Sequence, residues 1–292
     1  MIKIYDMETL EEREILFRGG SGADVSAPVA EILRAVQERG DAALREYTLR
    51  FDGAAPDALA VTAEEVDQAA AQVEPAFLAV LEEAAEHIRA YHARQKRESF
   101  VMTEREGVVL GQRIIPLARV GIYVPGGTAA YPSTVLMNAI PARIAGVGEI
   151  IMVTPPGRDG AVNPHILAAA KIAGVTRIYK VGGAQAVAAL AYGTGTIPQV
   201  DKIVGPGNAY VAEAKRQVFG RVNIDMIAGP SEVLVLADGR SNPAWVAADL
   251  LSQAEHDRMA AAVLVTDSRP LAEAVAHELE RQLAALPRAE IA

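Results

Sequence analysis

The spacing of apolar residues along the chain changes its period near Phe100. Before this point the period is helical. Residues 26–53, "SAPVAEILRAVQERGDAALREYTLRFDG", predict two amphipathic helices that are interrupted at Gly40. Asp41 has the residue type and position of an N-cap for the second of these helices. We therefore expect the chain to begin with a helical region.

The helical period continues to about residue 99 and then gives way to alternation. Thr62 and Glu65 have the spacing of a capping box, and residues 74–99 have the length and period of one long helix. Residues 100–124 alternate between apolar and polar positions around a Glu-Gly dipeptide. This pattern predicts a hairpin that leads into a strand.

From the end of this hairpin onward, short apolar runs alternate with helical stretches. The runs that predict strands are Ile150–Val153, Arg177–Val181, Lys202–Val204, Val233–Leu236 and Ala262–Val265. The stretches that predict helices are Ser133–Ile144, Pro164–Ala173, Ala184–Tyr192, Asn208–Phe219 and Pro243–Ala254. Continuously apolar strands between helices indicate parallel sheets with helices on both faces. We expect an α/β fold with two Rossmann-like, doubly wound parallel-sheet domains after the helical N-terminal region.

Composition narrows the class of protein. The 292 residues are 51% apolar and 22% charged, as in an ordinary globular protein, and the net charge of −9 argues against a nucleic-acid-binding protein. The chain has no cysteine, which excludes disulfides, thiolate metal sites and a thiol nucleophile and suits a cytoplasmic protein. Two long uncharged stretches are broken by glycine and proline, so we interpret them as buried core and not as membrane spans.

Glycine follows the ends of several predicted strands. The segments are "YVPGGTAAYPS", "KVGGAQAVAAL" and "KIVGPGNAYVAEAKRQ". Each alone is explained by a tight turn, but glycine at the start of a helix also lets backbone N–H groups approach an anionic group. The carboxyl ends of parallel strands meet at one edge of a sheet, so together these loops favour a phosphate-bearing ligand. Tyr123, Gln185 and Asn208 lie on them, where each could contact a ribose or base, cap a helix or satisfy buried backbone.

The segment "DLLSQAEHD" places Gln253 and His256 three residues apart near the end of a helix whose N-cap is Ser241 or Asn242. A histidine near a helix C-terminus can also be stabilised by the helix dipole alone. If the pair binds a metal ion, an imidazole and an amide oxygen are only two ligands, whereas catalytic zinc has three protein ligands as a rule. The remaining ligands would have to come from elsewhere.

Six motifs in order resemble the histidinol dehydrogenase family across nearly the whole chain. They are "GIYVPGG", "STVLMNAIPARIAG", "VGGAQAVAALAYGT", "VDKIVGPGNAYVAEAKRQV", "IDMIAGPSEVLVLAD" and "DLLSQAEHD". The resemblance implies a zinc-dependent enzyme that oxidises L-histidinol through L-histidinal to L-histidine with two NAD, in histidine biosynthesis. It also implies an intertwined homodimer.

The resemblance assigns roles to individual residues. It implies that Tyr123, Gln185 and Asn208 bind NAD. It implies that Ser231 binds substrate, and that Gln253 and His256 bind both zinc and substrate. It further divides the chain into an N-terminal extension (1–24), a first, incomplete α/β domain with the metal and substrate half-site (25–120 plus 231–292), and a second, NAD-binding domain (121–230).

Family members continue past the position of Ala292. The Glu-His pair for acid–base chemistry, an Asp and a His that complete the zinc site, and the tail that wraps the dimer partner all lie in that stretch. We therefore interpret the chain as a truncated member or a fragment whose catalytic residues are unknown. Two alternatives stay open: a related zinc- and NAD-dependent dehydrogenase for another small polyol, and an inactive dinucleotide-binding fragment.

Overall fold

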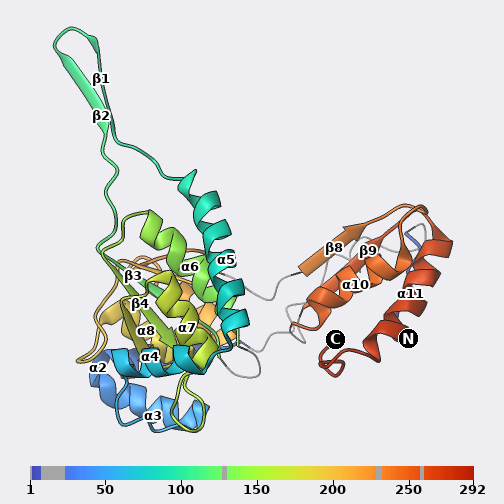
Figure 1. The fold of residues 1–292 in the computed structure, drawn as a ribbon, viewed down its shortest axis with the longest axis horizontal. Coiled ribbons are helices and arrows are strands. Elements are labelled where there is room, and N and C mark those ends of the chain that lie inside the picture. Colours follow the sequence, from blue (N-terminus) through green and yellow to red (C-terminus); the bar gives the residue numbers. More distant parts are fainter. Residues whose placement is uncertain (1, 8–23, 127–129, 228–231, 257–259) are drawn as a thin grey trace. The chain divides into compact units, whose positions relative to one another are not determined.

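The computed structural model describes residues 2–7, 24–126, 130–227, 232–256 and 260–292. Its contacts divide these residues into two compact units (Figure 1). The first unit is Asp24–Ile227. The second contains residues 2–7 and the described residues that follow Ile227.

A five-stranded parallel sheet forms the centre of the first unit. Its strands are β3 (Arg119–Tyr123), β4 (Glu149–Thr154), β5 (Arg177–Lys180), β6 (Lys202–Val204) and β7 (Asn223–Ile224). They lie in the order β5-β4-β3-β6-β7. The chain starts at β3, moves outward through β4 and β5, and then returns to the other side of β3. This is the strand order of a Rossmann fold, and the order reverses between β3 and β6.

Helices cover both faces of this sheet, as the sequence predicts (Figure 1). Successive residues of β4 alternate between the faces: Ile150 and Met152 belong to one buried cluster, and Ile151 and Val153 to the other. The first cluster includes residues of α5 (Pro75–Ala93), α6 (Pro132–Ile144) and α7 (Pro164–Ala173), with α4 (Ala63–Gln72) beside them. The second cluster includes residues of α2 (Ser26–Arg39), α3 (Asp41–Asp52), α8 (Gly183–Tyr192) and α9 (Ala209–Val218).

The helices α2 to α5 belong to the same unit as the five-stranded sheet. The physical reason is their apolar faces. Val29 and Val36 of α2 and Leu44 of α3 are buried in the same cluster as the small side chains of α8. We expected residues 25–120 to form a domain with residues 231–292, and that assignment stays a prediction.

The expected hairpin is present between the helical region and the sheet. β1 (Phe100–Arg105) pairs with β2 (Val108–Gln112) in an antiparallel ladder, and Gly107 at the turn has a φ of 73°. The capping box is also confirmed: Thr62 and Glu65 each accept a hydrogen bond from the backbone of the other.

One predicted cap is wrong. Gly40 is the N-cap of α3, and Asp41 is its first residue. The Asp41 carboxylate instead accepts a hydrogen bond from the Thr196 hydroxyl at 2.6 Å. A carboxylate in the first turn of a helix is favourable for the helix dipole in either position, so the local sequence pattern does not distinguish the two.

The second unit contains a βαβα segment. β8 (Glu232–Leu236) and β9 (Ala261–Val265) are parallel and residue-paired along their length, and α10 (Pro243–Ala254) and α11 (Arg269–Leu283) pack on them through Val246, Leu250 and Leu271. Asn242 caps α10 by accepting a hydrogen bond from the Ala244 N–H at 2.9 Å. Within the described ranges of the chain, no helix combines the length and the apolar content that a membrane span requires.

Candidate functional site: the carboxyl edge of the five-stranded sheet

The loops after β3, β5 and β6 lie at the carboxyl edge of the sheet, where its strand order reverses. In open parallel sheets, ligands bind outside the strands at this reversal. Gly205, directly after β6, has a φ of 115°, and a side chain there would overlap the carbonyl oxygen of Tyr123 at the end of β3. Only glycine lets the two backbones approach so closely. The glycine after β6 therefore lets the loop lie directly against the end of β3, where the strand order reverses.

A buried ion pair fixes the backbone of Gly205. The Lys215 ammonium donates to the Gly205 carbonyl oxygen at 2.9 Å and forms an ion pair with Asp225. The other Asp225 carboxylate oxygen accepts from the Gly205 N–H at 2.8 Å. The Lys215 side chain is 2% exposed. Both backbone polar groups of Gly205 are thus held by one pair of charges, which sets the shape of the loop that leads to Asn208.

Tyr123 ends β3 and is almost completely buried, with 4% exposure. Its hydroxyl oxygen accepts a hydrogen bond from the Gly183 N–H at 3.0 Å, which links the end of β3 to the first turn of α8. Burial raises the pKa of Tyr123 to about 12, with a further contribution from the charge of Asp52. The phenol is therefore neutral at physiological pH and can act as a hydrogen-bond donor.

Gln185 lies in the same turn of α8 and is 1% exposed. Neither its amide oxygen nor its amide nitrogen has a hydrogen-bond partner among the described residues. The amide is next to Gly183, because a side chain at that glycine would come within 2.6 Å of the Gln185 oxygen. A buried amide without partners is uncommon and costs about 1–3 kcal/mol, so it needs an explanation. A ligand at the start of α8 provides one.

Asn208 is exposed at the start of α9, after β6. Its side-chain oxygen accepts a hydrogen bond from the Val211 N–H at 3.1 Å, so the residue is the N-cap of α9. The structure thus places Tyr123 and Gln185 together around Gly183. Asn208 follows the loop that Gly205 begins, and its contact with a ligand stays a prediction.

The residues expected at the metal and substrate half-site belong to the second unit. Gln253 lies in the last turn of α10 and is partly buried. His256 is exposed and lies two residues after Ala254, where the helix ends as expected. The His256 N–H still donates to the Gln253 carbonyl oxygen at 3.1 Å, so a helical turn continues between them. Ser231 lies outside the described residues.

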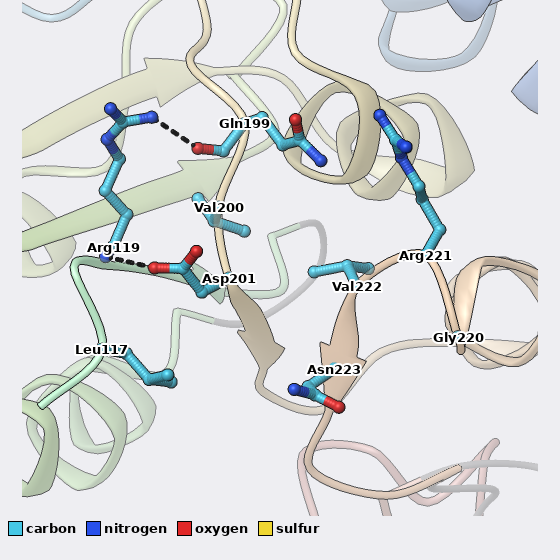
Figure 2. A pocket seen from close by; sticks show the side chains of 9 residues that line it. All are labelled: Leu117, Arg119, Gln199, Val200, Asp201, Gly220, Arg221, Val222 and Asn223. Atoms are coloured by element: carbon cyan, nitrogen blue, oxygen red, sulfur yellow. Dashed lines mark hydrogen bonds between the residues drawn. The ribbon is translucent and has the colours of Figure 1, made fainter. Parts of the chain in front are cut away.

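Two open pockets of the first unit lie at opposite edges of the sheet. One of about 450 Å³ lies beside the ends of β4 and β5, where Lys180 forms an ion pair with Glu65. The other, of about 480 Å³, lies at the opposite, amino edge of the sheet (Figure 2). There Arg119 donates from its guanidinium to the Gln199 carbonyl oxygen at 3.0 Å, and its N–H donates to Asp201 at 2.8 Å (Figure 2). Through these bonds Arg119, at the start of β3, holds the segment that leads into β6.

Comparison with known proteins agrees with the resemblance in the sequence. The family model for histidinol dehydrogenase matches residues 18–292. A histidinol dehydrogenase of Geobacillus kaustophilus is 61% identical over 264 residues, covering 90% of this chain and 62% of that protein. One of Listeria monocytogenes is 54% identical over 285 residues, covering 98% of this chain and 66% of that protein.

A solved structure agrees as well. The crystal structure of histidinol dehydrogenase from Elizabethkingia anophelis matches with a TM-score of 0.87 and 42% identity, covering 92% of this chain and 63% of that one. The chain therefore spans 62–66% of the length of these relatives. The α/β fold, the order of the motifs and the family model lead to one conclusion: the chain belongs to the histidinol dehydrogenase family.

Proposed function

We propose that the protein acts as a histidinol dehydrogenase, in which this chain binds NAD at the carboxyl edge of the five-stranded sheet. The full reaction is the zinc-dependent oxidation of L-histidinol through L-histidinal to L-histidine, with two NAD. The family membership supports the reaction, and the buried, unpartnered amide of Gln185 supports the position of the cofactor. We further propose a homodimer in the cytoplasm, as the family implies.

The residues at the carboxyl edge fit a dinucleotide. Backbone N–H groups in the first turn of α8 that follow Gly183 can receive a phosphate, because the start of a helix carries the positive end of its dipole. The Gln185 amide can both donate to and accept from a ribose or carboxamide group. Tyr123 fixes the Gly183 peptide through its hydroxyl and keeps its own proton available for donation.

The chemistry at this edge follows from these contacts. NAD, when bound, supplies a nicotinamide ring that accepts hydride from the alcohol carbon. The protein's part is to hold the dinucleotide, to orient it against β3 and β6, and to exclude water from the buried surface around Tyr123 and Gln185. None of these side chains is placed to remove the hydroxyl proton, since Tyr123 is neutral and Gln185 does not ionise.

The zinc site does not close within the described residues. No group of three or more His, Cys, Asp or Glu side chains lies close enough there to hold a metal ion. Gln253 and His256 are two donors, one of them an amide oxygen, and zinc in proteins has three or four protein ligands as a rule. Within the described residues the pair can therefore serve only as half of a zinc site.

A completed polypeptide tests the proposed activity. The chain would be joined, after Ala292, to the final third of the Geobacillus kaustophilus relative and assayed for NADH formation with L-histidinol, NAD and zinc. We expect two NADH per histidinol from the fusion, with loss of NADH formation when Gln185 is replaced by leucine. No NADH from histidinol, with turnover of another amino alcohol or polyol, would instead support the related dehydrogenase.

The two-donor half-site favours a second candidate for the chain by itself, an inactive dinucleotide-binding fragment. The same assay on the 292-residue chain distinguishes the two. NADH binding without turnover supports the fragment, whereas turnover by the chain alone would mean that other residues of this chain perform the acid–base steps.

A further inference from the structure

Asp52, the last residue of α3, has an unfavourable position for a carboxylate. Its Oδ2 atom is buried and has no hydrogen-bond partner among the described residues. A negative charge at the C-terminal end of a helix is also opposed by the helix dipole. Burial raises the pKa of Asp52 to about 6, so the carboxyl is still ionised at physiological pH. The buried oxygen without a partner and the charge at the helix C-terminus both destabilise the fold, which suggests that Asp52 binds a ligand.

The surroundings of Asp52 are those of the proposed NAD site. The segment that follows α3 runs along β5, where the Lys180 N–H at the end of the strand donates to the Leu59 carbonyl oxygen at 2.7 Å, and this places the end of α3 near the carboxyl edge. Leu44 and Tyr47 of α3 pack in the same buried cluster as Tyr123, and the charge of Asp52 contributes, after burial, to the raised pKa of Tyr123. The Tyr123 hydroxyl in turn accepts from Gly183, beside the unpartnered amide of Gln185. Thr48, one helical turn before Asp52, is fully buried and its hydroxyl also lacks a partner within the described chain. The last turn of α3 therefore carries two buried oxygen atoms without a partner in the described chain, one from Thr48 and one from Asp52.

This sheet lacks an acidic residue at the position from which dinucleotide-binding folds usually bind a ribose. In dinucleotide-binding Rossmann folds, an acidic residue after the second strand accepts hydrogen bonds from the ribose hydroxyls. Here the second strand is β4, which ends at Thr154 and is followed by Pro155 and Pro156, so no carboxylate comes directly after it. The first acid in that loop, Asp159, accepts the Ala161 N–H at 3.0 Å and so is engaged in its own turn.

We propose that Asp52 is a ribose-binding residue of the dinucleotide site, with its carboxylate accepting hydrogen bonds from the ribose hydroxyls. This inference rests on the proposed binding of NAD at the same edge. A ribose diol has two O–H donors, and an ionised carboxylate is an acceptor only, so the two groups match. Helix α3, from the N-terminal region, thereby supplies the ribose-binding carboxylate that the loop after β4 lacks.

The test is binding of NADH to the 292-residue chain and to its Asp52→Asn variant, measured by the change in NADH fluorescence. A hydrogen bond to a charged group contributes about 1.5–3 kcal/mol, so we expect the variant to bind about 10- to 100-fold more weakly. Asp57→Asn, at an exposed acid of the segment that follows α3, is the matched control and should bind as the unchanged chain does. Asp52→Asn should unfold at an equal or higher denaturant concentration, which separates lost binding from lost folding.

Analogues of NADH that lack ribose hydroxyls, in the adenosine half or in the nicotinamide half, make the test specific. The unchanged chain and the variant should bind one of these analogues with the same affinity, namely the analogue that lacks the hydroxyls contacted by Asp52. An equal loss with every analogue, or no loss with NADH, would overturn the proposal for Asp52 alone. Failure of the unchanged chain to bind NADH would overturn the proposed NAD site as well.

Discussion

Asp225→Asn should destabilise the first unit more than Lys215→Met, although both substitutions remove the same ion pair. The two charges differ in exposure: the Lys215 side chain is 2% exposed and the Asp225 side chain 30%. Without a carboxylate partner, the ammonium stays in the interior with only neutral acceptors, among them the Gly205 carbonyl oxygen. Without the ammonium, the carboxylate can be hydrated by solvent and still accepts from the Gly205 N–H.

The expected magnitudes follow from this difference. Breaking a buried ion pair so that one charge is left behind costs about 3–5 kcal/mol. We expect about 3 kcal/mol for Asp225→Asn, because the amide oxygen can still accept a hydrogen bond. We expect about 1–2 kcal/mol for Lys215→Met, because methionine fills the apolar part of the site and the remaining charge is partly solvated.

The assay is denaturant unfolding of the chain and its variants followed by circular dichroism, with hydrogen exchange of the α9 amides to assign the transition to the first unit. Lys171→Met is the matched control: its ion pair with Asp67 at 2.7 Å joins side chains that are 54% and 66% exposed, and its loss should cost less than about 1 kcal/mol. The reasoning is refuted if Lys215→Met costs as much as Asp225→Asn, or if Asp225→Asn stays within the range of the control.

Three further predictions concern the candidate sites. The pKa of Asp52 rises from 3.8 to about 6 on folding, so the free energy of unfolding should fall by about 1–2 kcal/mol as the pH rises between these values, after allowance for the partial exposure of the side chain. Denaturant unfolding of the chain and of Asp52→Asn across this pH range should show that the variant lacks this loss. Gly205→Ala should lower the free energy of unfolding by more than about 2 kcal/mol and weaken NADH binding. Gly220 also has a positive φ but has open space around it, so Gly220→Ala should lower the free energy of unfolding by about 1–2 kcal/mol and leave NADH binding unchanged. Zinc should bind the chain no more tightly than about micromolar, as calorimetry would show, and His256→Ala should weaken it further; nanomolar binding would mean a completed site.

Much of the fold could be predicted because its elements have strong local patterns. The bounds of α7 and β6 agree with those expected from the sequence, since proline and glycine end the apolar runs at those positions. β7 could not be predicted, because two residues carry no period. The division of the chain into units also depends on which apolar faces meet, and each helix of the N-terminal region has a face that suits more than one partner.

The candidate site was predictable only in part. Tyr123 ends a strand and Gln185 follows one, each close to glycine, and this local signal made both of them candidates; their contact with a ligand stays a prediction. Asp52 was missed, because an acid before a glycine at the end of a helix has the pattern of an ordinary surface residue. Its burial depends on packing with segments far away in the sequence. The same holds for Lys215 and Asp225, whose pairing across Gly205 appears only when α9 and β7 are in place.

The central claim is that a dinucleotide binds where the strand order reverses, and a crystal structure of the 292-residue chain with NADH tests it most directly. The account predicts the dinucleotide at the carboxyl ends of β3 and β6, with the Gln185 amide in hydrogen bonds to it and a ribose against Asp52. NADH in the pocket at the amino edge beside Arg119, or a carboxyl edge that stays empty at saturating NADH, would contradict it.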